Sequence, residues 1–97
     1  MTAVHARVCA ISDSPTTCTG LALAAVASRL AYTPEELLLT LENIGPDIGV
    51  VIITSRLAAR SADILERYRE KNSMPLITII PDPDDFNALK PAQGAMP

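Results

Sequence analysis

A run of seven residues, Ile48–Thr54, constrains the fold of this chain more than any other feature. Its sequence, Ile-Gly-Val-Val-Ile-Ile-Thr, is β-branched and continuously apolar, without the alternation of a strand that has one solvated face. Such a pattern predicts a strand covered on both faces, which is typical of the centre of a parallel sheet. A second run of this kind, Leu76–Ile80, is ended by Pro81.

Helical patterns separate the strands. Residues 7–11 form a first apolar run, and the densely apolar segment that starts at Thr19 predicts a mostly buried helix of about three turns. A short, weak strand is expected over residues 29–32. In Thr33-Pro34-Glu35-Glu36, Thr33 is the expected N-cap and the Glu36 carboxylate reaches back to the cap. Gly45-Pro46 ends that helix, and Ser55 caps a third one over about residues 56–71.

The order of these elements predicts a small doubly wound α/β domain, similar to a Rossmann or receiver fold. We expect a parallel four-stranded sheet with helices on both faces, because strands that alternate with helices are joined by right-handed crossovers. Ninety-seven residues are about the size of one small domain. We place that domain over residues 1–82, followed by a proline-rich, flexible tail over residues 83–97.

Charge and composition exclude several classes of function. The net charge is −3 and aromatic residues make up 3% of the chain, which argues against a nucleic-acid binder and against binding to anionic membranes. The longest apolar run, residues 21–27, is far shorter than the roughly 20 residues of a bilayer span. Without a secretory signal, we expect a cytoplasmic protein in which Cys9 and Cys18 are reduced thiols.

Polar residues follow the predicted strands, where a doubly wound sheet binds its ligands. The first loop offers Ser12, Asp13 and several hydroxyls, which suit either a phosphate ligand or a capped polar turn; no glycine-rich phosphate motif is present. Asp13 is a candidate phosphoacceptor, as in receiver domains, or simply a turn residue. Asp82 and its acidic neighbours suit either a hard cation or solvent. His5 is the only histidine, and we expect no catalytic residue, cofactor or metal.

Three arginines, Arg56, Arg60 and Arg67, flank one side of the third predicted helix. Residues 56–71 carry five basic and three acidic side chains, so this helix is positive in an acidic chain. Two interpretations compete: the arginines pair with Asp63 on the helix surface, or they meet an acidic partner. As candidate partner-binding residues we therefore take Arg56, Arg60 and Arg67, with Ser12 and Asp13 at the strand ends.

Three segments of the chain form a recognisable set. They are Arg7-Val-Cys-Ala-Ile-Ser-Asp13 with Thr17-Cys-Thr-Gly-Leu21, residues 47–58 (Asp-Ile-Gly-Val-Val-Ile-Ile-Thr-Ser-Arg-Leu-Ala), and Pro75-Leu-Ile-Thr-Ile-Ile-Pro81. They resemble, in this order, the start, the Asp-Ile-Gly strand with the helix that follows, and the last strand of the F subunit of the V-type and archaeal A-type rotary ATPases. The resemblance covers about residues 7–82. Family members continue into a C-terminal helix, which Pro91, Gly94 and Pro97 cannot sustain here.

The resemblance implies a protein that is not itself an enzyme. The F subunit lies on the central stalk of the rotary motor, bound to the coiled-coil D subunit, and helps couple ATP hydrolysis or synthesis to rotation and to proton or other ion transport. The implied partners are the other ATPase subunits, chiefly the D subunit. The implied location is cytoplasmic and peripheral to the membrane, without insertion. The alternatives are a receiver-like signalling domain and a small α/β protein that binds a phosphate ligand.

Overall fold

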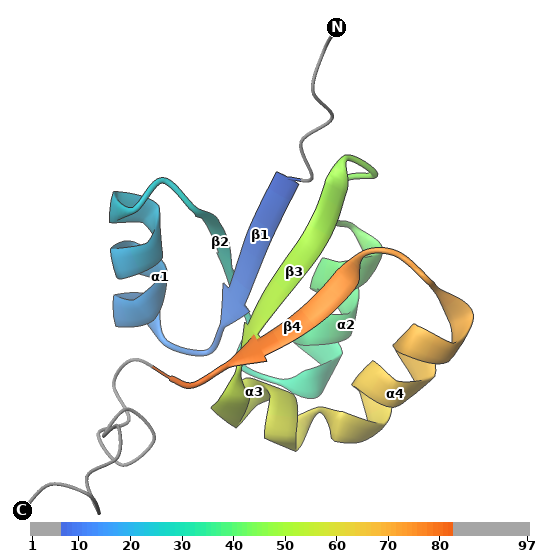
Figure 1. Ribbon diagram of the computed structural model, residues 1–97. Coiled ribbons are helices and arrows are strands. Elements are labelled where there is room, and N and C mark those ends of the chain that lie inside the picture. Colours follow the sequence, from blue (N-terminus) through green and yellow to red (C-terminus); the bar gives the residue numbers. More distant parts are fainter. Residues whose placement is uncertain (1–6, 83–97) are drawn as a thin grey trace, which may run out of the picture.

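Four parallel strands form the centre of the molecule, in the order β2-β1-β3-β4 (Figure 1). In this computed structural model, residues 7–82 are described, so the expected tail and the absence of a C-terminal helix lie outside the described residues. The strands are β1 (Arg7–Ser12), β2 (Ala27–Leu30), β3 (Ile48–Thr54) and β4 (Leu76–Ile80). The helices are α1 (Pro15–Leu23), α2 (Pro34–Glu42), α3 (Ser55–Arg60) and α4 (Ala62–Lys71). The doubly wound α/β fold is thus confirmed.

The strongest predicted strand occupies the predicted place. β3 pairs with β1 on one side and β4 on the other, and Val51 and Ile53 are fully buried. Both residues face α2, α3 and α4, whose leucines complete the apolar core on that side of the sheet. The core consists of Ile11, Ala31, Leu37, Leu41, Val51, Ile53, Leu57, Ala58 and Leu65.

The predicted cap at the start of α2 is confirmed, with one hydrogen bond to the Thr33 side chain and one to the Glu36 side chain. The Thr33 hydroxyl accepts a hydrogen bond from the Glu36 N–H at 3.1 Å. The Glu36 carboxylate reaches back, one residue beyond the cap, and accepts from the Tyr32 N–H at 2.6 Å. Two backbone donors at the helix start are therefore satisfied by side chains that are neighbours in sequence.

Helix α1 differs from its prediction in position and in burial. It begins at Pro15 instead of Thr19, because Ser14 caps it by accepting from the Thr17 N–H at 3.2 Å. It is not mostly buried: Thr17 is its one buried residue, and Leu23 is 86% exposed. The early start also ends the helix early, and β2 forms two residues before the predicted position. The sheet leaves one side of α1 without a covering element among the described residues.

The predicted helix over residues 56–71 is broken at Ser61 into α3 and α4. Ser61 has φ −111° and ψ 20°, outside helical values, and its N–H is shared between the Leu57 and Ala58 carbonyls. The break places Arg56 and Arg60 on α3 and Arg67 on α4, although Arg60 and Arg67 still line one hollow. The row of arginines expected along one helix is therefore divided between two helices.

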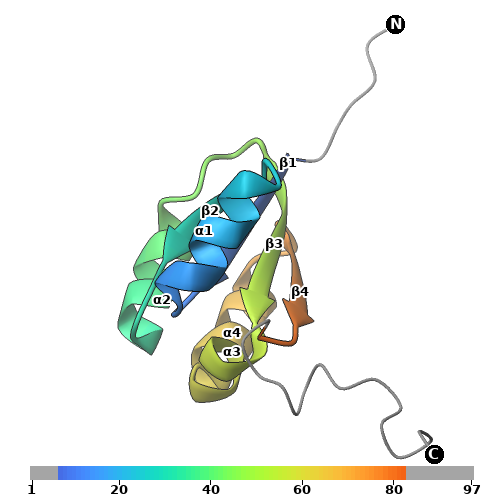
Figure 2. The same cartoon turned by 90° about the vertical axis from the view of Figure 1, so that its left-hand side faces the viewer.

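From β1 the chain continues to β2 on one side and then returns to β3 on the other side of β1, so the strand order reverses between β1 and β3. The helix after β1, α1, lies on one face of the sheet, where the Ser28 hydroxyl donates to the Cys18 carbonyl at 3.1 Å. The helices after β3 pack on the opposite face, with Leu57 and Leu65 in the core. Figure 2 shows α1 in front of the sheet, with α3 and α4 behind β3 and β4. The carboxyl ends of β1 and β3 therefore form the point at which such folds place their ligands.

Candidate functional site

Polar side chains gather where β1 and β3 end, and the chain after β4 returns to the same place. We call this group the switch-point cluster. Its members are Ser12, Asp13, Thr54, Ser55, Arg56, Arg60 and Asp82. Four of the five predicted partner-binding residues belong to it; Arg67 does not.

The base of the cluster is a pair of buried hydroxyls. The Thr54 hydroxyl donates to the Ser12 hydroxyl oxygen at 3.1 Å, which joins the ends of the two central strands. The Ser14 N–H also donates to the Ser12 oxygen at 3.1 Å. Ser12 is fully buried, so its role is to hold the turn that presents Asp13 rather than to reach the surface.

The Asp13 carboxylate forms ion pairs with both arginines of α3. Arg60 Nη2 lies 2.8 Å from one carboxylate oxygen, and Arg56 Nη2 lies 3.4 Å from the other. The two arginine side chains are about half exposed, whereas the Asp13 side chain is 12% exposed. Arg60 thus pairs with a residue 47 positions away instead of with Asp63 on its own segment.

Asp82 enters the cluster from the end of β4. Its side chain is 1% exposed, and one carboxylate oxygen accepts from the Arg56 N–H at 2.7 Å and from the Ser55 hydroxyl at 3.1 Å. The other oxygen lies 3.5 Å from Arg56 Nη2. Asp82 therefore caps α3 from a distant part of the chain. The sequence pointed only to a cation or solvent at Asp82, because no local pattern links it to Ser55.

The charges of the switch-point cluster balance. Two arginines face two aspartates, so a phosphate there would have to displace Asp13 from Arg60 and Arg56. Within residues 7–82, no group of three His, Cys, Asp or Glu side chains is placed to hold a metal ion. The arrangement suits an ion-paired corner that locks β1, β3 and the end of β4 together.

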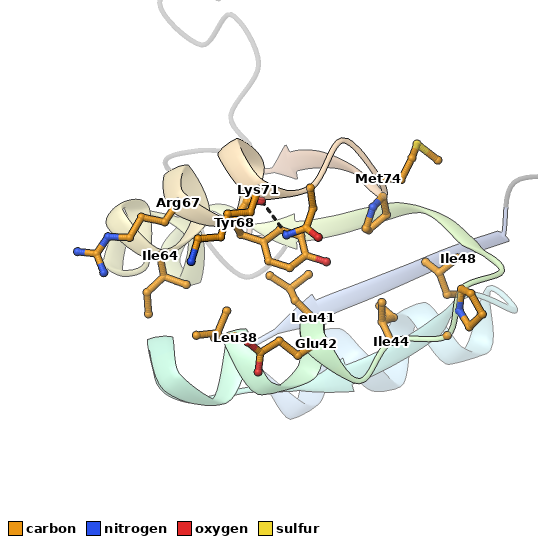
Figure 3. Close-up of a pocket in the computed structure, with 14 residues that line it drawn as sticks. Leu38, Leu41, Glu42, Ile44, Ile48, Ile64, Arg67, Tyr68, Lys71 and Met74 are labelled. Carbon is orange, nitrogen blue, oxygen red and sulfur yellow. Dashed lines mark hydrogen bonds between the residues drawn. The ribbon is translucent and has the colours of Figure 1, made fainter.

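Arg67 belongs to a second feature, a groove of about 580 Å³ between α2 and α4 (Figure 3). Leu38 and Leu41 of α2 point toward Ile64 and Tyr68 of α4 across it. The charged residues that line it are Glu42, Arg67 and Lys71, and its other lining residues are Ile44, Gly45, Pro46, Ile48, Asn72, Met74 and Pro75. The groove runs along the face of the sheet, from Ile48 and Met74 near the amino-terminal ends of the strands to Ile64 and Arg67.

Tyr68, which lines this groove, has a raised pKa. Partial burial raises the pKa of the Tyr68 hydroxyl, and the nearby Glu42 carboxylate raises it further. Both effects disfavour the charged phenolate, so the hydroxyl holds its proton further into the alkaline range than a free tyrosine does. An apolar floor with charged residues on its margin is suited to protein contact more than to chemistry.

The fold and these two features define a class: a small doubly wound α/β domain whose ligand corner is closed by its own ion pairs. Residues 8–93 match the model of a protein family described as the ATP synthase (F/14-kDa) subunit. The chain belongs to this family. A search of curated proteins gave no match. Family membership makes the chain part of a V/A-type ATP synthase complex and implies other proteins of that complex as its partners. No helix among residues 7–82 has the length and apolarity to cross a membrane.

Proposed function

We propose that this chain is the non-catalytic, central-stalk F subunit of a V/A-type rotary ATPase. In that role it couples ATP hydrolysis or synthesis to rotation and to proton or other ion transport, on the cytoplasmic side and peripheral to the membrane. The observation that carries the proposal is the family match over residues 8–93. The internally paired switch-point cluster supports it, because a coupling protein works through its surfaces.

The partner in this proposal is chiefly the coiled-coil D subunit of the stalk. Two charged regions support such contact: the half-exposed guanidinium groups of Arg56 and Arg60 beside Asp13, and Arg67 at the α2–α4 groove. Ser12 supports this contact indirectly, because its hydroxyl oxygen accepts from the Ser14 N–H and so holds the turn that carries Asp13. A coiled coil that presents carboxylates to these arginines gains charge-assisted hydrogen bonds.

The test is co-purification of the full chain with the other stalk and catalytic subunits from the same source. We expect a stoichiometric complex that contains the D-type coiled coil, and a chain that purifies without any of those subunits would disprove the role. Arg67→Glu is expected to weaken the complex. Arg69→Glu is the matched control, because Arg69 is on the same helix and donates to the Ile77 carbonyl instead of lining the groove.

A further inference from the structure

One half of one face of the sheet lacks a covering layer among the described residues. α1 covers this face over β1 and β2, whereas no helix stands in front of β3 and β4 (Figure 2). The residues on this half alternate with the core residues of the same strands. We call them the open sheet face: Val8, Val50, Ile52, Leu76, Thr78 and Ile80.

The register makes the open sheet face continuous. Val8 pairs with Val50, and Val50 pairs with Leu76, so three aliphatic side chains form a row across three neighbouring strands. Leu76 is 56% exposed and Val8 is 38% exposed, although Val51 beside them is fully buried on the opposite face. Ile52 and Ile80 are partly buried and extend the apolar surface toward the carboxyl ends of the strands.

A parallel sheet is normally covered on both faces, because its strands are apolar on both sides. An aliphatic side chain left in water forfeits about 25 cal/mol for each Å² that burial would remove. A row of exposed aliphatic side chains on a small domain therefore marks a contact surface. The shape of the gap indicates an α-helix, since α1 already fills the neighbouring half of the same layer.

The dimensions and charge of the gap select the kind of helix. β3 has seven residues, or about 23 Å at roughly 3.3 Å each, which corresponds to about 15 helical residues. No charged residue belongs to the open sheet face, and residues 14–28, which include all of α1, are also uncharged. The stripe that fits there is apolar and uncharged over about four turns.

The sequence of residues 83–97 does not meet this requirement. Pro83 and Pro91 leave only seven residues between them, about 10 Å of helix, and Pro97 follows soon after. We infer that the open sheet face binds a helix of another protein, of about four turns, through an apolar stripe without charges. The inference rests on the proposed function, which supplies helical partner proteins.

The experiment places a photo-crosslinking amino acid at Leu76, and separately at Leu39, in the full chain assembled with the other subunits. Leu39 is the matched control, because it is 58% exposed but lies on α2, on the opposite side of the sheet. We expect a crosslink from position 76 to a helix of another protein of the complex and none from position 39. A crosslink from position 76 to residues 83–97 or to a second copy overturns the inference, as does a partner crosslink from position 39 alone.

Affinity measurements separate this inference from the proposed function. Leu76→Glu places a charge on a side chain that is already more than half exposed, so the domain is expected to fold; circular dichroism checks this. We expect at least a tenfold loss of affinity for the partner subunits, with little change for Leu39→Glu. If the unaltered chain binds and Leu76→Glu binds equally well, the inference fails alone. If the unaltered chain does not bind, the proposed function fails and the inference fails with it.

Discussion

Asp82 and Arg56 are joined by a hydrogen bond of 2.7 Å between the Asp82 carboxylate and the Arg56 backbone N–H. The helix α3 has no side-chain cap from its own N-cap residue, Thr54. Asp82, 26 positions further along the chain, takes that place and also accepts from the Ser55 hydroxyl. The end of β4 is thus tied to the start of α3.

Asp82→Ala is expected to lower the free energy of unfolding by about 2 kcal/mol, because the part-buried donors of Arg56 and Ser55 lose this acceptor. Asp82→Asn should cost less, since an amide oxygen still accepts. Urea unfolding measures both. Asp63→Ala, an exposed carboxylate in the first turn of α4, is the control and should change stability by less than about 0.5 kcal/mol. Equal losses for Asp82→Ala and Asp63→Ala would contradict the capping role.

Ala25 occupies a position that favours glycine. Its φ is 64°, and α1 ends there in a Schellman arrangement: the Ala25 N–H donates to the Ala22 carbonyl and the Val26 N–H to the Leu21 carbonyl, both at 2.9 Å. We expect Ala25→Gly to raise the free energy of unfolding by about 0.5–1 kcal/mol, because the left-handed conformation costs a β-carbon about 1–2 kcal/mol.

The neighbouring alanine is the control for that experiment. Ala24 has φ −90°, so Ala24→Gly only adds freedom to the unfolded chain and should lower stability by about 0.5–1 kcal/mol. Thermal unfolding of the two variants should therefore shift in opposite directions. Shifts in the same direction would show that the turn relaxes when its residue is changed.

Ser61 has a buried hydroxyl oxygen for which the described residues offer no hydrogen-bond partner. Ser61→Ala removes this buried polar group and is expected to stabilise the protein by about 1 kcal/mol in chemical denaturation. Ser55→Ala is the matched comparison, because the Ser55 hydroxyl donates to Asp82 and its loss should destabilise. A destabilising effect of Ser61→Ala would mean that its hydroxyl does make a hydrogen bond.

Cys9 makes stability depend on pH in the alkaline range. Burial raises the pKa of the Cys9 thiol, Arg29 opposes this shift, and Cys18 adds to it. In the unfolded chain the thiol ionises near its ordinary pKa of about 8.5, while the folded protein still holds the proton. Above about pH 8.5 the unfolded state therefore binds fewer protons than the folded state. The contribution of the thiol to the free energy of unfolding is fully present below that pH and falls as the pH rises toward the pKa of the folded state.

The slope of that loss should approach about 1.4 kcal/mol per pH unit, because one proton separates the two states. The measurement is the free energy of unfolding in urea at intervals between pH 7 and pH 10. Cys9→Ala lacks the thiol, so this part of the slope should vanish in the variant. An identical pH profile in both proteins would remove Cys9 as its source.

Local signals in the sequence predicted much of the fold. The Thr33 cap, the strand Ile48–Thr54 and the strand Leu76–Ile80 each depend on neighbouring residues, and each forms where predicted. The burial of Leu76–Ile80 on both faces was predicted wrongly, because Leu76, Thr78 and Ile79 are exposed. The start of α1 was missed, although Ser14-Pro15 is the same kind of signal as Thr33-Pro34. The dense apolar pattern after Thr19 outweighed it and also suggested a burial that the sheet does not provide.

The candidate site was less predictable, because its contacts join distant segments. The position of Asp13 and Arg56 at strand ends indicated that they lie at one edge of the sheet. No local pattern specifies how α3 is oriented on the sheet. This orientation determines the Asp13–Arg56 ion pair, the Asp13–Arg60 ion pair and the Asp82 cap. The division of the arginines between two helices follows from the break at Ser61, a residue that favours helix N-caps but that the charged pattern of residues 56–71 does not single out.

That break has a consequence for how this protein can change. Although it divides the arginines between two helices, Arg60 and Arg67 still line one hollow beside Pro34 and Asp63, so the effects of substitutions at the two positions should couple rather than add. Arg60 also pairs with Asp13 and Arg67 also lines the α2–α4 groove, so a change of charge at either position reaches both surfaces, and the two have to be redesigned together.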